Sequence, residues 1–166
     1  MKFYDQYSYQ IDTELRESEQ FLKEIWRKET EKHLEQPHSY PYVEQILRSF
    51  TERRPELLPE QLFQFDLAEA LFFQEKLDVA IYQHLRYLPA YWHSHSFLEV
   101  AYVLEGSCTH YILEQKLLMQ AGDICILAPD TLHTISACSD DCILFNLLLR
   151  ISTFETAFFG TLAEDD

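Results

Sequence analysis

The stretch His93-Ser94-His95-Ser96-Phe97-Leu98-Glu99 decides how the rest of the chain can be interpreted. Polar and apolar residues alternate here and an apolar run follows, which predicts a β-strand over residues 92–104. Side chains alternate between the two faces of a strand, so four of them are expected on one face: His93, His95, Phe97 and Glu99. Two imidazoles and a carboxylate on one face predict a site for a divalent metal, because these groups are its usual ligands.

A second stretch, residues 122–133, supplies a fourth candidate ligand. It reads Gly-Asp-Ile-Cys-Ile-Leu-Ala-Pro-Asp-Thr-Leu-His, which predicts a turn, a buried apolar strand, a Pro-Asp turn and then His133. The complete set of candidate metal ligands is therefore His93, His95, Glu99 and His133.

Together the two stretches resemble the cupin family. His93, His95, Glu99 and Gly106 have the spacing of the first cupin motif, and the distance from Gly122 to His133 matches the second. The chain departs from the second motif at three positions: Ala128, Asp130 and Ala137. More narrowly, residues 87–159 resemble the sensory domain of AraC-type transcription regulators. The matching residues are His93, His95, Phe97, Glu99, Tyr102, Val103, Gly106, Gly122, Asp123, Pro129 and His133.

The resemblance implies a mainly β fold. This is a cupin barrel (a double-stranded β-helix, or jelly roll) with an α-helical N-terminal region and a closing C-terminal helix. In such a barrel the four ligand positions converge from different strands. Three histidines and a carboxylate suit Fe(II), Mn(II), Ni(II) or Zn(II), with open positions for water or a ligand. AraC-type sensory domains also use the barrel as a small-molecule pocket without a metal, so both alternatives stay open.

Aromatic side chains near the motif are predicted to line a pocket for a small molecule. The candidates are Trp92, Phe97, Tyr102 and Phe145. Aromatic walls with a few polar groups suit a sugar or an apolar effector.

The composition bounds the alternatives. With 166 residues, of which 47% are hydrophobic and 14% aromatic, the chain is long enough for one domain with a full core. No apolar run approaches the roughly 20 residues that a membrane-spanning helix needs, and residues 1–10 lack the apolar segment of a signal peptide. We therefore expect a cytoplasmic protein. The net charge of −15 argues against nucleic-acid binding by this chain, because contacts to phosphates need Lys and Arg.

The first 75 residues are predicted to be a helical extension. Residues 12–34, 41–53 and 60–73 carry apolar side chains at helical spacing, and prolines separate the three segments. We expect the first of these helices to lie, with a solvated outer side, on a barrel formed by residues 76–166, whereas the pattern does not place the other two against the sheet. A contact between subunits through the charged first helix is the alternative.

From residue 77 onward the apolar pattern changes to a period of two. Strands are predicted over residues 78–87, 92–104, 108–113, 116–119, 124–127, 132–136 and 142–151, with a closing helix over 153–162. Two of the three glycines, Gly106 and Gly122, fall in predicted turns. Many short strands separated by turns indicate a barrel or jelly roll without any use of the resemblance.

The four cysteines and two isolated histidines are interpreted as structural residues. Cys108, Cys125, Cys138 and Cys142 form no CxxC pair, so reduced, structural thiols are expected. The isolated residues His84 and His110 are interpreted as surface or core side chains whose hydrogen bonds are satisfied.

Three functions compete at this point. The favoured one is a small-molecule effector-sensing, homodimeric domain of an AraC-type regulator, with no chemistry of its own. DNA would then be bound only through a basic helix-turn-helix domain, which we expect to be absent from this chain. The second is a metal-dependent cupin enzyme, such as a dioxygenase or a sugar isomerase. The third is a cupin that binds a metal or small molecule without regulating anything.

Overall fold

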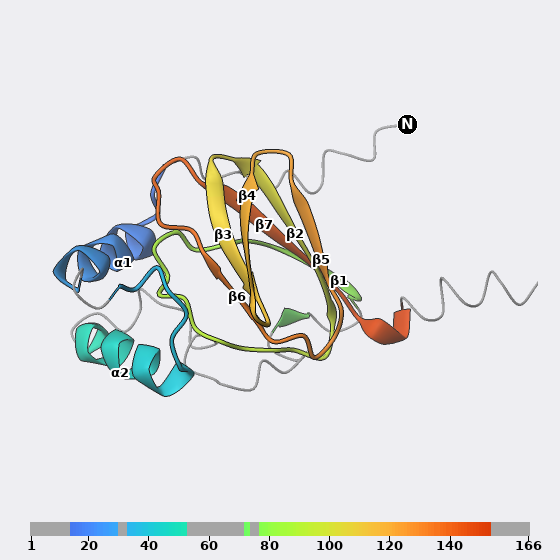
Figure 1. Cartoon of the computed structure of the whole chain (residues 1–166), viewed down its shortest axis with the longest axis horizontal. Coiled ribbons are helices and arrows are strands. Elements are labelled where there is room, and N and C mark those ends of the chain that lie inside the picture. The colour runs from blue at the N-terminus through green and yellow to red at the C-terminus, as the bar shows by residue number, and fades with distance from the viewer. Residues whose placement is uncertain (1–13, 30–32, 53–71, 74–76, 154–166) are drawn as a thin grey trace, which may run out of the picture.

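The computed structural model describes residues 14–29, 33–52, 72–73 and 77–153. Within these residues two antiparallel sheets face each other, as Figure 1 shows. The first sheet has the order β1 (Val79–Gln83), β7 (Ile143–Leu149), β2 (Leu98–Glu105) and β5 (Ile124–Leu127). The second has the order β4 (Gln115–Gln120), β3 (Ser107–Ile112) and β6 (His133–Ser136). The prediction of a mainly β, jelly-roll architecture is confirmed.

Strand β2 carries Glu99 into the interior. Along it Glu99, Ala101 and Val103 are buried, whereas the residues between them lie on the outer face. This alternation is the period of two that the sequence shows. Because β2 lies between β5 and β7, Glu99 has a strand neighbour on each side, Leu127 and Leu148. A central strand is held by two ladders, so the carboxylate is fixed in place.

The chain crosses from the first sheet to the second at Gly106. This residue has a φ of +67°, and a Cβ atom there would lie 2.7 Å from the carbonyl oxygen of Asp141. Glycine is the residue that tolerates both conditions. Gly122 also has a positive φ, so both predicted turn glycines are confirmed in that role.

The core between the sheets contains two of the cysteines. Its buried residues are Ala101, Val103, Cys108, Met119, Ile135, Ala137, Cys142 and Leu144. All four cysteines of the chain are free thiols in the structure, as predicted.

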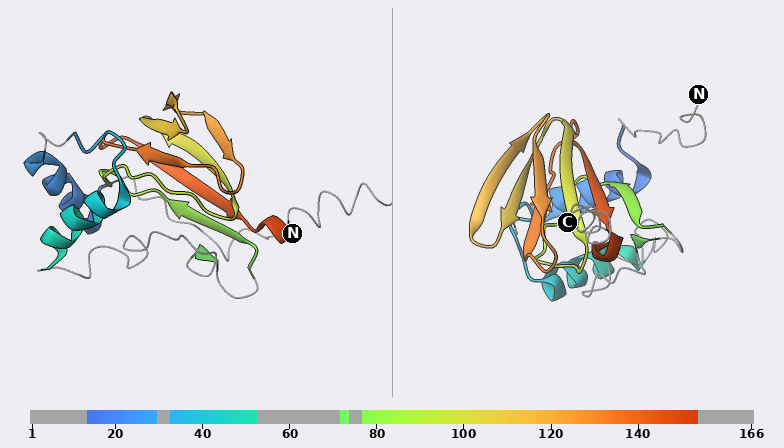
Figure 2. Two further views of the ribbon diagram at one scale, coloured as in Figure 1. Left: turned by 60° about the horizontal axis from the view of Figure 1, so that its bottom comes forward. Right: turned by 90° about the vertical axis from the view of Figure 1, so that its right-hand side faces the viewer.

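Two helices lie together at one end of the barrel in each view (Figures 1 and 2). Helix α1 spans Glu17–Lys28 and helix α2 spans Tyr40–Thr51. They share one hydrophobic core with the segment that joins β1 to β2; its members are Leu22, Ile25, Leu34, Tyr40, Val43, Ile46, Leu47, Tyr87, Leu88 and Tyr91. Among the described residues no helix is long and apolar enough to cross a membrane.

Helix α1 is shorter than the predicted span of residues 12–34. It begins at Glu17 because the backbone of Arg16 is extended, and the carboxylate of Glu19 accepts the Arg16 N–H at 2.9 Å. It ends at Lys28; Leu34 is buried in a turn that follows. Helix α2 agrees with its prediction to within two residues. Most of the predicted helices 60–73 and 153–162 lies outside the described residues.

The predicted strand over residues 92–104 is only partly correct. The ladder of β2 begins at Leu98, so His93 and His95 precede the strand. His93 is held instead by an isolated bridge to His133, with backbone N···O distances of 3.0 and 3.1 Å. The carbonyl of His95 accepts the backbone N–H of Asp130 at 2.8 Å. Both histidines are therefore fixed to residues 130–133, which lead into β6 of the opposite sheet, rather than to a neighbouring strand.

Candidate functional site

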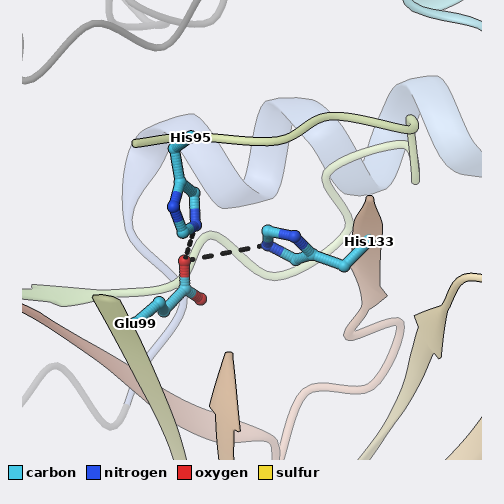
Figure 3. A group of neighbouring side chains, drawn as sticks. All are labelled: His95, Glu99 and His133. Carbon is cyan, nitrogen blue, oxygen red and sulfur yellow. Dashed lines mark hydrogen bonds and ion pairs between the residues drawn. The ribbon is translucent and has the colours of Figure 1, made fainter. Parts of the chain in front are cut away.

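Three side chains converge inside the barrel from three places in the chain (Figure 3). Glu99 comes from β2, His133 from the start of β6, and His95 from the segment before β2. The Nε2 atom of His95 lies 2.8 Å from Oε2 of Glu99, and the Nε2 atom of His133 lies 3.7 Å from the same oxygen. One ligand atom from each residue lies within 4.8 Å of the others, and all three residues are buried.

Backbone carbonyls fix the orientation of the imidazoles. The Nδ1 atom of His95 lies 2.9 Å from the carbonyl oxygen of Phe97, and that of His133 lies 2.8 Å from the carbonyl oxygen of Thr131. A carbonyl oxygen only accepts hydrogen bonds, so each Nδ1 carries the proton and donates it. The lone pair of each neutral ring is then on Nε2, which faces Glu99. This is the arrangement that supports imidazole ligands of metals.

The contact between His95 and Glu99 requires a positive charge. In the neutral ring, Nε2 and the carboxylate oxygen would both present lone pairs at 2.8 Å. A second proton on His95 or a cation between the two groups resolves this conflict. Two ligands that each lie about 2.1 Å from one ion, at a right angle, are about 3 Å apart. This is close to the 2.8 Å between His95 Nε2 and Glu99 Oε2, whereas the 3.7 Å between His133 Nε2 and the same oxygen corresponds to a wider angle. The donor set therefore fits a divalent metal.

The electrostatics of Glu99 favour the ionised carboxylate. Burial alone would raise its pKa, but the hydrogen bonds and charges of His133 and His95 outweigh burial and hold the pKa below its ordinary value. Its second oxygen, Oε1, is buried without a hydrogen-bond partner among the described residues. A buried carboxylate oxygen without a partner is costly, and coordination of a cation would satisfy it.

His93 lies beside this group but does not join it. Its Nδ1 lies 2.9 Å from the carbonyl oxygen of Tyr91, so its ring is oriented as the other two are. Its ring centroid is 4.4 Å from that of His133 and 6.4 Å from that of His95. Burial lowers its pKa to about 3, which keeps the ring neutral. The structure thus brings together three of the four predicted ligands and leaves His93 next to them.

The predicted aromatic residues divide between two faces. Phe97 is buried, and its ring stacks on His95 with the centroids 4.0 Å apart. Trp92 is half-buried. Tyr102 and Phe145 are register partners on β2 and β7. They share the outer face of that sheet, because Glu99 and Ala101 point inward, and they therefore do not face the histidines.

The interior contains further polar side chains that the sequence analysis did not select. Both ring nitrogens of His110 are buried without a hydrogen-bond partner among the described residues, as are Nε2 of His84 and Oδ1 of Asn146. The ring of His110 lies 5.6 Å from that of His133. The interpretation of His84 and His110 as satisfied side chains is therefore wrong. Burial lowers the pKa of each to about 4, so both rings are neutral.

The alternation of side chains along the strands could have indicated that Asn146 and His110 lie in the interior. Asn146 falls between Leu144 and Leu148, two apolar residues of the buried face of β7. His110 follows Cys108 at the same period on β3. A polar residue in phase with a buried face indicates an interior position.

Comparison with known proteins agrees with this architecture. The family model for the AraC-like ligand binding domain matches residues 79–165, just over half of the chain. The chain belongs to this family, and its fold is a cupin jelly roll. No curated protein sequence matches the chain.

Several solved cupin structures are similar to part of the chain. KdgF from Halomonas sp. is 18% identical over 50% of this chain and 81% of that chain, with a TM-score of 0.40. A cupin-2 domain containing protein from Shewanella frigidimarina is 21% identical over 48% of this chain and 86% of that chain, with a TM-score of 0.36. A cupin protein from Bacteroides fragilis is 28% identical over 45% and 66%, with a TM-score of 0.36.

Proposed function

We propose that this chain is the effector-sensing and dimerisation domain of a cytoplasmic AraC-type transcription regulator, and that a divalent metal forms part of its effector site. The observation that carries the proposal is the convergence of His95, Glu99 and His133 inside an AraC-like ligand binding domain. These three residues would hold the ion, with His93 as a neighbouring fourth candidate. When bound, the ion would supply a Lewis acid that coordinates an oxygen atom of the effector.

The side chains around the ion have supporting roles in this proposal. Phe97 stacks on His95 and excludes water from one side of the imidazole. His110 and Asn146 offer buried polar atoms that find no partner within the described part of the chain, which suits a polar effector such as a sugar. The buried histidines near Glu99 would therefore recognise a polar, uncharged effector together with the metal.

The test is a binding screen on the whole chain. Thermal unfolding would be followed with sugars and related polyols, each with and without Fe(II), Mn(II), Ni(II) or Zn(II). A binding effector raises the melting temperature in a concentration-dependent manner. We expect the shift to be lost in His95→Ala and kept in His33→Asn. His33 is an exposed histidine with a φ of +50°, a conformation that asparagine tolerates. Failure of every metal and every ligand to shift the wild-type transition would contradict the proposal.

A metal-dependent cupin enzyme is the second candidate, because a centre with three protein ligands leaves positions for a substrate. Turnover separates the two functions. A sensor returns its ligand chemically unchanged after long incubation, whereas an enzyme converts it. Mass spectrometry of any compound that the screen identifies, incubated with metal-loaded protein in air, makes the distinction.

A further inference from the structure

The outer face of the first sheet is apolar on all four strands. On the edge strands it presents Val79 and Ile81 from β1 and Ile124 and Ile126 from β5. In the middle the outward residues are Leu98, Val100 and Tyr102 on β2, which pair with Leu149, Leu147 and Phe145 on β7. Among the described residues that face outward along these strands, none is charged; Gln83, which pairs with Phe145 on this face, is polar but buried. The charges begin at its rim, where Arg150 lies 3.6 Å from Asp78.

Much of this face is exposed. Ile126 is 67% exposed, Ile124 61% and Ile81 51%. Four strands about 4.8 Å apart and about five residues long project roughly 300 to 400 Å². The largest apolar patch on a typical monomer covers about 300 to 600 Å² and is often functional. The projected area of this face is also the size expected for the apolar centre of a standard interface, which buries about 800 Å² on each partner.

Helix α1 offers no comparable surface among its described residues. The apolar side of α1 is already buried, because Leu22 and Ile25 pack in the core that α1 shares with α2. The exposed residues of α1 are polar or charged, among them Glu24, Arg27 and Lys28. The interpretation of α1 as a subunit contact therefore has no free apolar area to support it.

We propose that the outer face of the sheet β1-β7-β2-β5 binds the same face of a second copy of this chain. This inference rests on the proposed function, which includes a dimer, and it places the contact on the sheet instead of on the helices. Two copies that each carry a net charge of −15 repel one another, and they meet least repulsion where both surfaces lack charge. Two sheet faces pack together at about 10 Å, so a twofold axis through the centre of the face brings like residues together.

The experiment is sedimentation of the whole chain over the micromolar range of concentrations, with lysine introduced at single positions. Ile126→Lys and Ile81→Lys place a charge on opposite edges of the face. Leu118→Lys is the matched control, because Leu118 is 66% exposed but lies on β4 of the other sheet. We expect a wild-type dimer, a dissociation constant at least about 100-fold higher in the two sheet variants, and no change in the control. Circular dichroism confirms that each variant is folded.

Two results would overturn the proposal. The first is a wild-type chain that stays monomeric over the whole concentration range, because the sheet face then does not bind a second copy. A dimer that resists both sheet variants places the contact elsewhere. Metal and effector binding, measured on the same samples, tests the proposed function separately, since Ile126 lies on the opposite face from Glu99.

Discussion

Glu19 and Arg86 form an ion pair that is almost completely excluded from solvent, with 2.9 Å between Glu19 Oε2 and Arg86 Nη2. The carboxylate also accepts the backbone N–H of Arg86 at 2.9 Å. Arg86 belongs to the segment between β1 and β2 that leads into His93 and His95. The pair therefore fixes helix α1 to the part of the chain that delivers two of the candidate ligands.

The first prediction concerns this pair. Glu19→Gln removes the carboxylate charge that pairs with the buried guanidinium of Arg86, so we expect a loss of roughly 3 to 5 kcal/mol in the free energy of unfolding at neutral pH. Urea denaturation measures it. Glu24→Gln, on the exposed side of the same helix, should change the free energy by less than about 0.5 kcal/mol. Equal effects of the two substitutions would show that the ion pair does not anchor the helix.

The second prediction is the pH dependence of the same pair. Burial alone would raise the pKa of Glu19, but the hydrogen bonds from Arg86 and Arg16 outweigh it and lower the pKa from 4.5 to about 2. A carboxyl group whose pKa is lower in the folded state stabilises the fold above its unfolded pKa and loses that contribution as the pH falls. The difference in stability between wild type and Glu19→Gln should therefore shrink between about pH 4.5 and pH 2. A difference that is constant over this range would contradict the shift.

The sequence was sufficient to predict the barrel and most of the site, and specific residues show why. Glu99 and His133 could be selected because their spacing from the turn glycines Gly106 and Gly122 matches the two cupin motifs. The alternation of side chains along β2 then indicates which of them face the interior. The position of His93 could not be predicted in the same way. Its placement depends on the bridge to His133, a contact between distant segments, and no local period encodes such a contact.

Tyr102 and the unpaired interior histidines illustrate two further limits. Tyr102 shares β2 with Glu99, and its odd separation of three residues places it on the opposite face, so parity alone could have excluded it from the interior. His110 is different, because its burial is visible in the strand period but its lack of a hydrogen-bond partner is not. Satisfaction of a polar atom depends on the surrounding strands, whose register the sequence does not specify.

A third prediction tests Asn146. Its Oδ1 is buried without a partner among the described residues, between Leu144 and Leu148 on the inner face of β7. A buried acceptor without a partner costs about 1 to 3 kcal/mol, and leucine has nearly the same shape without that cost. Asn146→Leu should therefore raise the unfolding free energy of the ligand-free protein by about 1 kcal/mol. Asn146→Ala, which leaves a gap, should not. A destabilised leucine variant would show that Oδ1 is satisfied in solution.

A fourth prediction uses the two turn glycines as a matched pair. In Gly106→Ala the new Cβ would meet the backbone of Asp141 and Cys142 within 3 Å, in addition to the positive φ. In Gly122→Ala nothing lies within 4 Å, so only the strain of the positive φ remains. We expect Gly122→Ala to cost about 1 to 2 kcal/mol and Gly106→Ala clearly more. Thermal unfolding of both variants checks the order, and a larger loss at Gly122 would be inconsistent with the close approach at Gly106.

The last prediction ranks the candidate metal ligands. The Nε2 atom of His95 lies 2.8 Å from Glu99, whereas His93 stands outside the group of three converging ligand atoms. His95→Ala should therefore weaken Zn(II) binding by more than the roughly 10- to 100-fold typical of losing a supporting group. His93→Ala should weaken it by at most about 100-fold, the range expected for a supporting group. Competition with a chromogenic chelator measures both affinities. Equal and large losses would mean that His93 moves into the coordination sphere on binding, and that the metal is held by four residues, as the motif spacing predicts. Loss of binding in neither variant would remove the metal from the proposed effector site.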